Sequence, residues 1–188
     1  MKTFESQRLI LREWKASDLT PFVLINQDPL VMEHMPCLLS EAESTAFRDR
    51  ILAHFDKHGF GLYACEIKET GEFIGYVGLN IPAFEAHFTP TVEIGWRLAS
   101  KHWGKGYATE GAKVILEKAF TEFKLPEVVS FTVPANIRSQ RVMQKIGMHH
   151  LTQENFQHPL LPSDHPLSWH VLYRLKREEF PSVHLGKY

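Results

Sequence analysis

Residues 91–111, TVEIGWRLASKHWGKGYATEG, change their hydrophobic period halfway along. Apolar residues alternate with polar or small ones over residues 92–98, which predicts a β-strand. From Ala108 onward, apolar residues recur at the spacing of an amphipathic helix. Gly104 and Gly106 fall between the two patterns, where glycine allows an anion to approach the unpaired N–H groups of a helix N-terminus. The segment therefore predicts a phosphate-binding turn.

Two well-known phosphate-binding patterns do not fit this turn. Gly106 and Gly111 have the spacing of a P-loop, but Lys113 comes one place late and no Ser or Thr follows it. Gly104 and Gly106 fit a dinucleotide fingerprint, but Thr109 stands where the third glycine belongs. An ordinary glycine turn without a ligand is the alternative, and a second motif downstream disfavours it.

The second motif is residues 136–147, NIRSQRVMQKIG. It follows residues 127–133, whose β-branched residues on both faces predict a buried strand. Asn136 is a suitable N-cap and Gly147 a suitable C′ residue for a basic helix that carries Ser139. The order is therefore a strand, an Asn-x-x-Ser helix start, a basic helix and a Gly-Met.

Both motifs resemble those of the GNAT superfamily of N-acetyltransferases. The run KHWGKG at residues 101–106 resembles its coenzyme A loop, Arg/Gln-x-x-Gly-x-Gly/Ala, with Lys101 replacing the usual Arg or Gln. Residues 136–147 resemble its motif B. The segments ESQRLILREW, EIGWRL, WGKGYATEG and WHVLYRL are similar to the branch that contains the ribosomal-protein N-terminal (alanine and serine) acetyltransferases. The resemblance covers about residues 3–178 and implies acetyl-CoA as co-substrate.

The fold implied by this resemblance is α+β (α/β/α). It has a mixed, mostly antiparallel central sheet of six to seven strands and about four helices. We expect one domain over residues 1–178 and a loose tail over residues 179–188. The expected strands are 8–14, 62–68, 72–80, 92–98, 127–133, 149–156 and 169–175, and the expected helices are 18–26, 40–58, 108–123 and 136–146. Asp18 is a predicted cap, and Ser40 with Glu43 predicts a capping box.

Acetyl transfer requires a base for the amine and stabilisation of the departing thiolate. Glu93, on the strand before the glycine turn, is the predicted base; its alternative is a structural carboxylate paired with Arg97. The resemblance implies that Ser139 acts on the coenzyme A sulfur, either by relaying a proton to it or by a hydrogen bond. The alternative role for Ser139 is a hydrogen bond from its hydroxyl to the backbone of its own helix. Tyr173 and, more weakly, Tyr107 are further candidates for the acid.

The expected cofactor contacts come from the two motifs and from the strand before the first. They are Trp96, Arg97, Leu98, Lys101, Trp103, Gly104, Lys105, Gly106, Tyr107, Ala108, Thr109, Asn136, Ser139 and Arg141. Arg138, Arg141 and Lys145 share one helical face. One or two of them are candidates for the 3′-phosphate of coenzyme A, although a solvated basic face is the preferred interpretation for each residue taken singly.

Composition limits the other classes of function. A net charge of −1 over 188 residues gives no general attraction to nucleic acid or acidic membranes, so neither is expected as a partner. Cys37 and Cys65 fit a reduced compartment, and the absence of an apolar leader favours a cytoplasmic protein. The eleven histidines match no zinc spacing, so no metal is expected. A monomer or homodimer is expected.

The acceptor is the least determined part of the prediction. Deprotonating an α-amine at pH 7 costs roughly 1 kcal/mol, against about 4.6 kcal/mol for a free lysine, so a single modest base favours a protein N-terminus. A small amine such as an amino acid, polyamine or drug is the alternative. A third possibility is a non-enzymatic protein that binds coenzyme A without catalysis. We expect residues 28–40, 81–90 and 157–168 to form the acceptor pocket.

Overall fold

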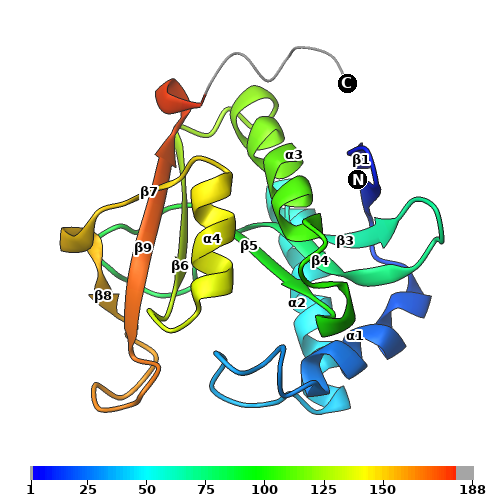
Figure 1. The fold of residues 1–188 in the computed structure, drawn as a ribbon, viewed down its shortest axis with the longest axis horizontal. Helices are drawn as coiled ribbons and strands as arrows, with labels where there is room; N and C mark the ends of the chain where they lie inside the picture. The colour runs from blue at the N-terminus through cyan, green and yellow to red at the C-terminus, as the bar shows by residue number, and fades with distance from the viewer. Residues whose placement is uncertain (1, 181–188) are drawn as a thin grey trace.

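A nine-stranded mixed sheet organises residues 2–180, which the computed structural model describes (Figure 1). Its strand order is β1-β2-β3-β4-β5-β6-β9-β7, and β8 pairs with β9. The strands are β1 (Phe4–Glu5), β2 (Leu9–Arg12), β3 (Leu62–Ile67), β4 (Phe73–Asn80), β5 (Glu93–Leu98), β6 (Glu127–Thr132), β7 (His149–His150), β8 (Phe156–Gln157) and β9 (Trp169–Lys176). The α-helices are α1 (Leu19–Gln27), α2 (Glu41–His58), α3 (Tyr107–Thr121) and α4 (Ile137–Lys145).

The predicted fold class is confirmed, but the number of strands was too low. The strand β1 was missed, and the strand expected over residues 149–156 is two short strands separated by a 3-10 turn, Thr152–Glu154. Each of these strands has only two residues, too few for an alternating pattern to reveal it. The loose tail expected at residues 179–188 lies, from residue 181 onward, outside the described residues.

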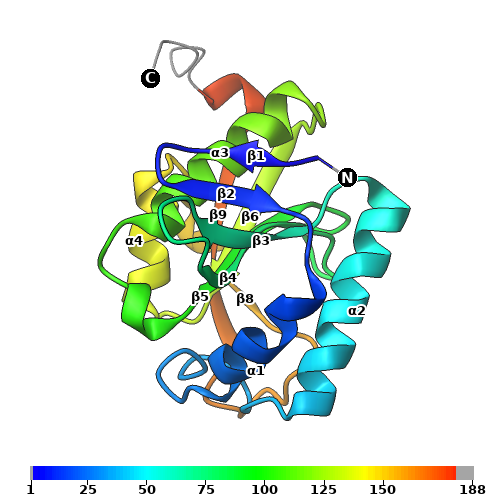
Figure 2. The ribbon, with the colours of Figure 1, turned by 90° about the vertical axis from the view of Figure 1, so that its right-hand side faces the viewer.

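The helices cover the two faces of the sheet. Helices α3 and α4 lie on one face, and α1 and α2 lie on the other (Figures 1 and 2). The buried stripe of α3 contains Ala112, Ile115 and Leu116, as its period predicted. Gly111 of α3 faces Val77 of β4, where an added Cβ would lie 3.2 Å from the valine side chain. The helix that follows the glycine turn is therefore packed directly on the centre of the sheet.

The strands β5 and β6 form the only parallel pair among the described strands, and they separate almost at once. Their register contains a single pair, Glu93 with Val129, supported by a hydrogen bond of 2.9 Å from Val129 N to Val92 O. Beyond this pair the two strands diverge (Figure 1). Helix α3 begins after β5 and α4 begins after β6, so both helix N-termini lie at the carboxyl ends of the diverging strands. The fold therefore opens a gap at the place where the two sequence motifs meet.

The ends of α2 were predicted correctly. Ser40 N donates to Glu43 Oε2 over 2.8 Å, and Glu43 N donates to Ser40 Oγ over 3.2 Å, which completes the capping box. Gly59, with φ of 72°, ends the helix in the left-handed conformation. This helix supplies Phe47 and Ser44, which become important at the site.

Asp18 is the N-cap residue of α1, as predicted, but its carboxylate makes no capping bond to that helix. It accepts hydrogen bonds from Lys15 N over 2.7 Å and from Arg12 Nη1 and Nη2 over 2.7 and 2.9 Å. Arg12 Nε also donates to Glu66 over 2.7 Å. Because Asp18 is only 2% exposed, this buried ion pair is its structural role.

We predict that Asp18→Ala lowers the free energy of unfolding by about 3 kcal/mol, because it leaves the buried Arg12 charge with one carboxylate fewer. Urea denaturation measures the change. Asp49→Ala is the matched control: Asp49 pairs with Arg48 at the surface, where such a pair contributes about 0–1 kcal/mol. Equal losses in the two variants would contradict the assignment.

Candidate active site

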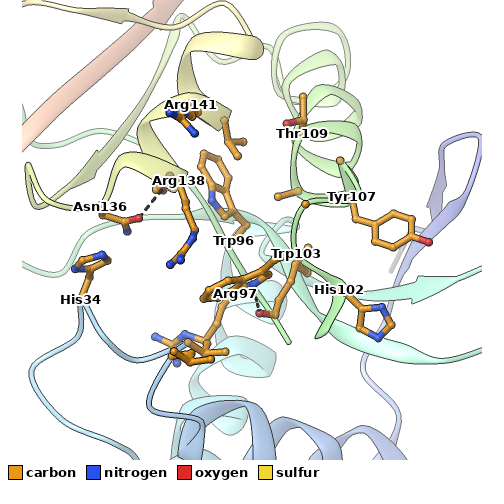
Figure 3. A pocket seen from close by; sticks show the side chains of 18 of the residues that line it. His34, Trp96, Arg97, His102, Trp103, Tyr107, Thr109, Asn136, Arg138 and Arg141 are labelled. Carbon is orange, nitrogen blue, oxygen red and sulfur yellow. Dashed lines mark hydrogen bonds between the residues drawn. The ribbon is translucent and has the colours of Figure 1, made fainter. Parts of the chain in front are cut away.

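A cavity of about 400 Å³ occupies the gap beyond the β5–β6 junction (Figure 3). Four segments surround it: the end of β5, the turn before α3, the first turns of α4 and the loop between α1 and α2. The lining residues are Leu30, Val31, His34, Met35, Trp96, Arg97, Leu98, His102, Trp103, Gly104, Gly106, Tyr107, Ala108, Thr109, Asn136, Arg138, Ser139, Arg141, Val142 and Lys145. The two motifs identified in the sequence thus line one cavity.

The turn before α3 has the backbone of an anion cradle. Gly104 and Gly106 have φ of 75° and 86°, a conformation that other residues rarely adopt. Gly106 is the N-cap residue, and no side chain caps the helix. Within residues 2–180, none of the backbone N–H groups from Gly104 to Thr109 has a recorded acceptor. These donors and the positive end of the α3 dipole favour a phosphate group here.

An acidic side chain in the first turn of α3 is held away from this cradle. Glu110 accepts hydrogen bonds from Ser6 Oγ over 2.7 Å and from Arg8 N and Nε over 2.8 and 2.7 Å. Burial by itself would raise the pKa of Glu110, but the bonds from Ser6 and Arg8 outweigh it and lower the pKa. The Arg8 guanidinium also lies 4.6 Å from the centre of the Tyr107 ring. Residues ahead of β2 therefore stabilise the turn.

The first turn of α4 points polar groups into the cavity. Asn136 Oδ1 accepts from Ser139 N over 3.1 Å, which confirms the predicted cap, and Asn136 Nδ2 donates to Thr132 Oγ1 over 3.0 Å. Gly147, with φ of 88°, follows the helix end as predicted. The Ser139 side chain has no hydrogen-bond partner recorded among residues 2–180, so the backbone-bonded alternative is not observed.

The basic face of α4 lines the cavity. Arg138, Arg141 and Lys145 are all exposed to solvent and also contribute to its wall, so a solvated face and a phosphate contact are both compatible with their positions. Arg138 reaches across the cavity and lies 4.9 Å from the centre of the Trp103 ring (Figure 3). Trp103 is itself fixed by donation from Nε1 to Leu98 O over 2.8 Å. Periodicity alone does not show which side of a short helix faces a ligand.

Two lysines predicted to contact the cofactor do not line the cavity. Lys101 Nζ donates to Glu72 Oε1 over 2.6 Å, and this bond lowers the pKa of Glu72. Lys105 is exposed on the turn. The positive charge of the cavity wall comes instead from Arg97 of β5 and from α4.

Glu93 lies at the point where β5 and β6 part. It is half-buried, and burial raises its pKa to about 8, against a smaller opposing effect of a hydrogen bond from Asn80. Its Oε1 would lie 4.0 Å from a Cβ at Gly95, on the same face of β5, and Glu93 itself is not among the residues that line the cavity. Within residues 2–180 no ion pair joins Glu93 to Arg97, so the alternative role of a carboxylate paired with that arginine is not observed.

Tyr173 lies outside the cavity lining. It is 2% exposed beneath α4, where its hydroxyl donates to Gln140 Oε1 over 3.3 Å and accepts from Gln144 Nε2 over 3.4 Å. Gln140 and Gln144 are on the side of α4 away from the lining residues. This position argues against the predicted role of Tyr173 as an acid in the reaction.

The histidines of the last strands join an aromatic cluster. His158 and His170 lie 5.1 Å apart, ring centre to ring centre, and both contact Phe131 and Phe156. Burial lowers the pKa of both imidazoles. Among residues 2–180 no three His, Cys, Asp or Glu side chains are placed to hold a metal ion.

Within the same residues, no helix has the length and apolar character needed to span a membrane.

Comparisons with known proteins agree with this site. A family model described as an acetyltransferase (GNAT) domain matches residues 8–149, and the chain belongs to this family of acetyl-CoA-dependent acetyltransferases. It is 28% identical to the uncharacterized N-acetyltransferase YnaD of Bacillus subtilis, over 93% of this chain and 97% of YnaD.

The chain is also similar to a fungal enzyme over part of its length and to a solved structure over most of its length. The chain is 35% identical to the FsC-acetyl coenzyme A-N(2)-transacetylase of Aspergillus fumigatus, over 58% of this chain and 48% of that protein. Its fold matches Mycobacterium smegmatis RimJ in complex with CoA-disulfide, with a TM-score of 0.75 and 20% identity over 96% of this chain and 89% of that one.

We predict that Arg141→Gln weakens acetyl-CoA binding roughly tenfold, because a charge-assisted hydrogen bond to a phosphate is lost. Calorimetry measures the dissociation constant. Lys113→Gln, which removes an exposed charge from α3 away from the cavity, is the control and keeps the affinity of the unaltered protein. Wild-type affinity in the Arg141 variant would show that this side chain does not meet the cofactor.

Proposed function

We propose that this protein transfers the acetyl group of acetyl-CoA directly to an amine, and that the preferred acceptor is the α-amine of a protein or peptide N-terminus. The observation that carries the proposal is Glu93, a carboxylate with a pKa raised to about 8 at the point where β5 and β6 part, on the strand that leads to the anion cradle. In this proposal the cofactor enters the gap from the side of α3 and α4. The acceptor amine reaches Glu93 at the inner end of the gap.

In the proposed reaction, Glu93 takes a proton from the ammonium form of the acceptor. The free amine attacks the thioester carbonyl, a C–N bond forms, and the carbonyl oxygen becomes an oxyanion. When the C–S bond of this tetrahedral intermediate breaks, the nitrogen loses its extra proton, which passes to the departing thiolate directly or through water, so that the products are the amide and the coenzyme A thiol. A base with a pKa of about 8 is matched to an α-amine, whose pKa is about 7.7–8.0, so the proton moves without a large free-energy change. A lysine side chain, with a pKa of about 10.4, is matched less well.

Ser139 is the group that we assign to the thiolate. It lines the cavity at the N-terminus of α4, and its hydroxyl is not used by another described residue. A serine hydroxyl is a weak acid, so it stabilises the sulfur by a hydrogen bond or relays a proton from water. The positive end of the α4 dipole adds to the stabilisation of the developing negative charge.

A small amine is the second candidate acceptor. The similarity to the Aspergillus transacetylase favours it, since the name of that enzyme specifies FsC rather than a protein. The role of a coenzyme A-binding module without catalysis is disfavoured, because Glu93 and Ser139 occupy both positions that the chemistry needs.

The choice between acceptors is made by a thiol-release assay. We expect the highest kcat/KM on short peptides with a free N-terminal Ser or Ala, and lower values on free amino acids, polyamines and amine drugs. The same peptides with a blocked N-terminus and a single lysine are the control and release little thiol. Turnover confined to small amines would reject the protein N-terminus and retain the acetyltransferase.

We predict that Glu93→Gln lowers kcat/KM by about 100-fold or more while acetyl-CoA still binds, because the base is lost and the cradle is unaltered. In the unaltered protein, only the ionised carboxylate accepts a proton, so kcat/KM rises with pH through about 8. The residual activity of the Glu93 variant lacks the part of the pH dependence that Glu93 contributes and keeps the part that comes from deprotonation of the acceptor α-amine, whose pKa is about 7.7–8.0. A pH profile of the variant that matches the unaltered protein would reject Glu93 as the base.

A further inference from the structure

The Arg97 side chain lies on the sheet face opposite α3. Alternation along β5 places Glu93, Gly95 and Arg97 on one face, and Trp96 and Leu98 on the other. The Arg97 guanidinium contacts Asn26 of α1 and the ring of Phe47 of α2, which confirms its direction. Arg97 also lines the cavity, so its side chain extends from the edge of the gap on the side of α1 and α2.

A buried support fixes the position of this guanidinium. Arg97 Nη1 donates to Asn26 Oδ1 over 2.7 Å, and Asn26 Nδ2 donates to Ser44 Oγ over 3.1 Å. Asn26 and Ser44 are fully buried, so the amide oxygen is held toward the arginine. The guanidinium also lies 5.5 and 5.7 Å from the ring centres of Phe47 and Tyr76. Its orientation is therefore set before any ligand arrives.

The charge of Arg97 has no carboxylate partner among residues 2–180. The other arginines of similar burial are neutralised: Arg12 pairs with Asp18 and Glu66, and Arg174 pairs with two glutamates. Arg97 Nη2 instead lies 3.4 Å from Met35 Sδ, a weak acceptor that a stronger one would displace. A half-buried cation that is fixed in place, lines a cavity and lacks an acid is suited to an anionic ligand.

The phosphates of the cofactor are not the best partners for this cation. Helices α3 and α4, whose first turn and basic side chains line the cavity, lie on the other face of the sheet (Figure 1), although Arg138 reaches across toward Trp103 and Glu33. Glu93 shares the face of Arg97, and an acceptor whose amine reaches Glu93 passes along this face. The anion that meets Arg97 therefore belongs to the acceptor.

We propose that the acceptor carries a carboxylate which Arg97 binds through its guanidinium fork, so that Arg97 selects acidic acceptors. The inference rests on the proposed acetyl transfer and specifies its substrate. Two sources share this chemistry: an Asp or Glu side chain close to the N-terminus of a peptide, or the carboxylate of a small amino acid. A planar carboxylate accepts two parallel N–H bonds from a guanidinium, and it would use the donors that Asn26 leaves available.

Matched pairs of acceptors test this without altering the protein. One arm compares peptides that differ only by Glu or Gln at the second or third residue, and the other compares amino acids with their amides. Calorimetry on protein saturated with coenzyme A gives their affinities, and thiol release from acetyl-CoA gives kcat and KM. We expect each acidic acceptor to bind at least about tenfold more tightly than the neutral acceptor of its pair. In the kinetics, the difference should appear mainly in KM and little in kcat.

Three variants separate recognition from folding. Arg97→Gln removes the preference for acids, which is measured as the ratio between acid and neutral acceptors on protein saturated with coenzyme A, so that a change in cofactor affinity does not affect it. Arg97→Lys keeps the charge but loses the fork, so it retains part of the preference. Arg50→Gln is the control: Arg50 lies 5.5 Å from the same Phe47 ring, is exposed and does not line the cavity, so its variant keeps the full preference.

The outcomes distinguish this inference from the proposed function. Loss of the acid preference in Arg97→Gln alone, with an unaltered melting temperature, supports the inference. Equal affinity for both members of every pair, or no binding of either member, overturns it even when neutral amines are acetylated. Carboxylate binding without thiol release would retain the inference and contradict the proposed transferase.

Discussion

The single backbone pairing between β5 and β6 is the constraint on which the site depends. Glu93 and Val129 hold the two parallel strands together at one point, and beyond it the backbone groups of both strands are released from each other. The two halves of the sheet can therefore diverge while each remains fully paired with its outer neighbours. The cavity of about 400 Å³ lies in this gap, between the end of β5, the turn before α3, helix α4 and the loop between α1 and α2. The same pair places the raised-pKa carboxylate at the inner end of the gap.

The sheet also separates two kinds of positive charge. On the side of α3 and α4, backbone N–H groups, Arg141 and Lys145 offer an anion site rich in donors and open to solvent. On the side of α1 and α2, Arg97 is held by an amide and two aromatic rings in a half-buried place. A phosphate-rich cofactor is suited to the first, and a single planar carboxylate to the second. If the proposed acceptor binds at Arg97, the two substrates would use different cations.

Local patterns predicted most of this architecture, and long-range contacts account for what was missed. The capping box of Ser40, the cap of Asn136 and the glycine turn before α3 depend on neighbours within a few residues, so the sequence contained the information. The Asp18 side chain was expected to cap α1, but Arg12 at the end of β2 binds its carboxylate, and no periodic pattern links these two nearby residues. Lys101 was expected at the cofactor, but Glu72, 29 residues away, binds it. The direction of Arg138 and the position of Tyr173 depend on how α4 is rotated on β9, which no short pattern encodes.

The tie between Glu110 and the start of the chain joins two regions that the sequence keeps about a hundred residues apart. Ser6 and Arg8 hold the carboxylate of the first α3 turn sideways, away from the unpaired N–H groups. A shortened N-terminus would release a negative charge one turn from the phosphate cradle while leaving every cradle residue in place. Ser6 and Arg8 thus fix the position of the Glu110 carboxylate. Removing or altering the residues around them would change cofactor binding as well as folding.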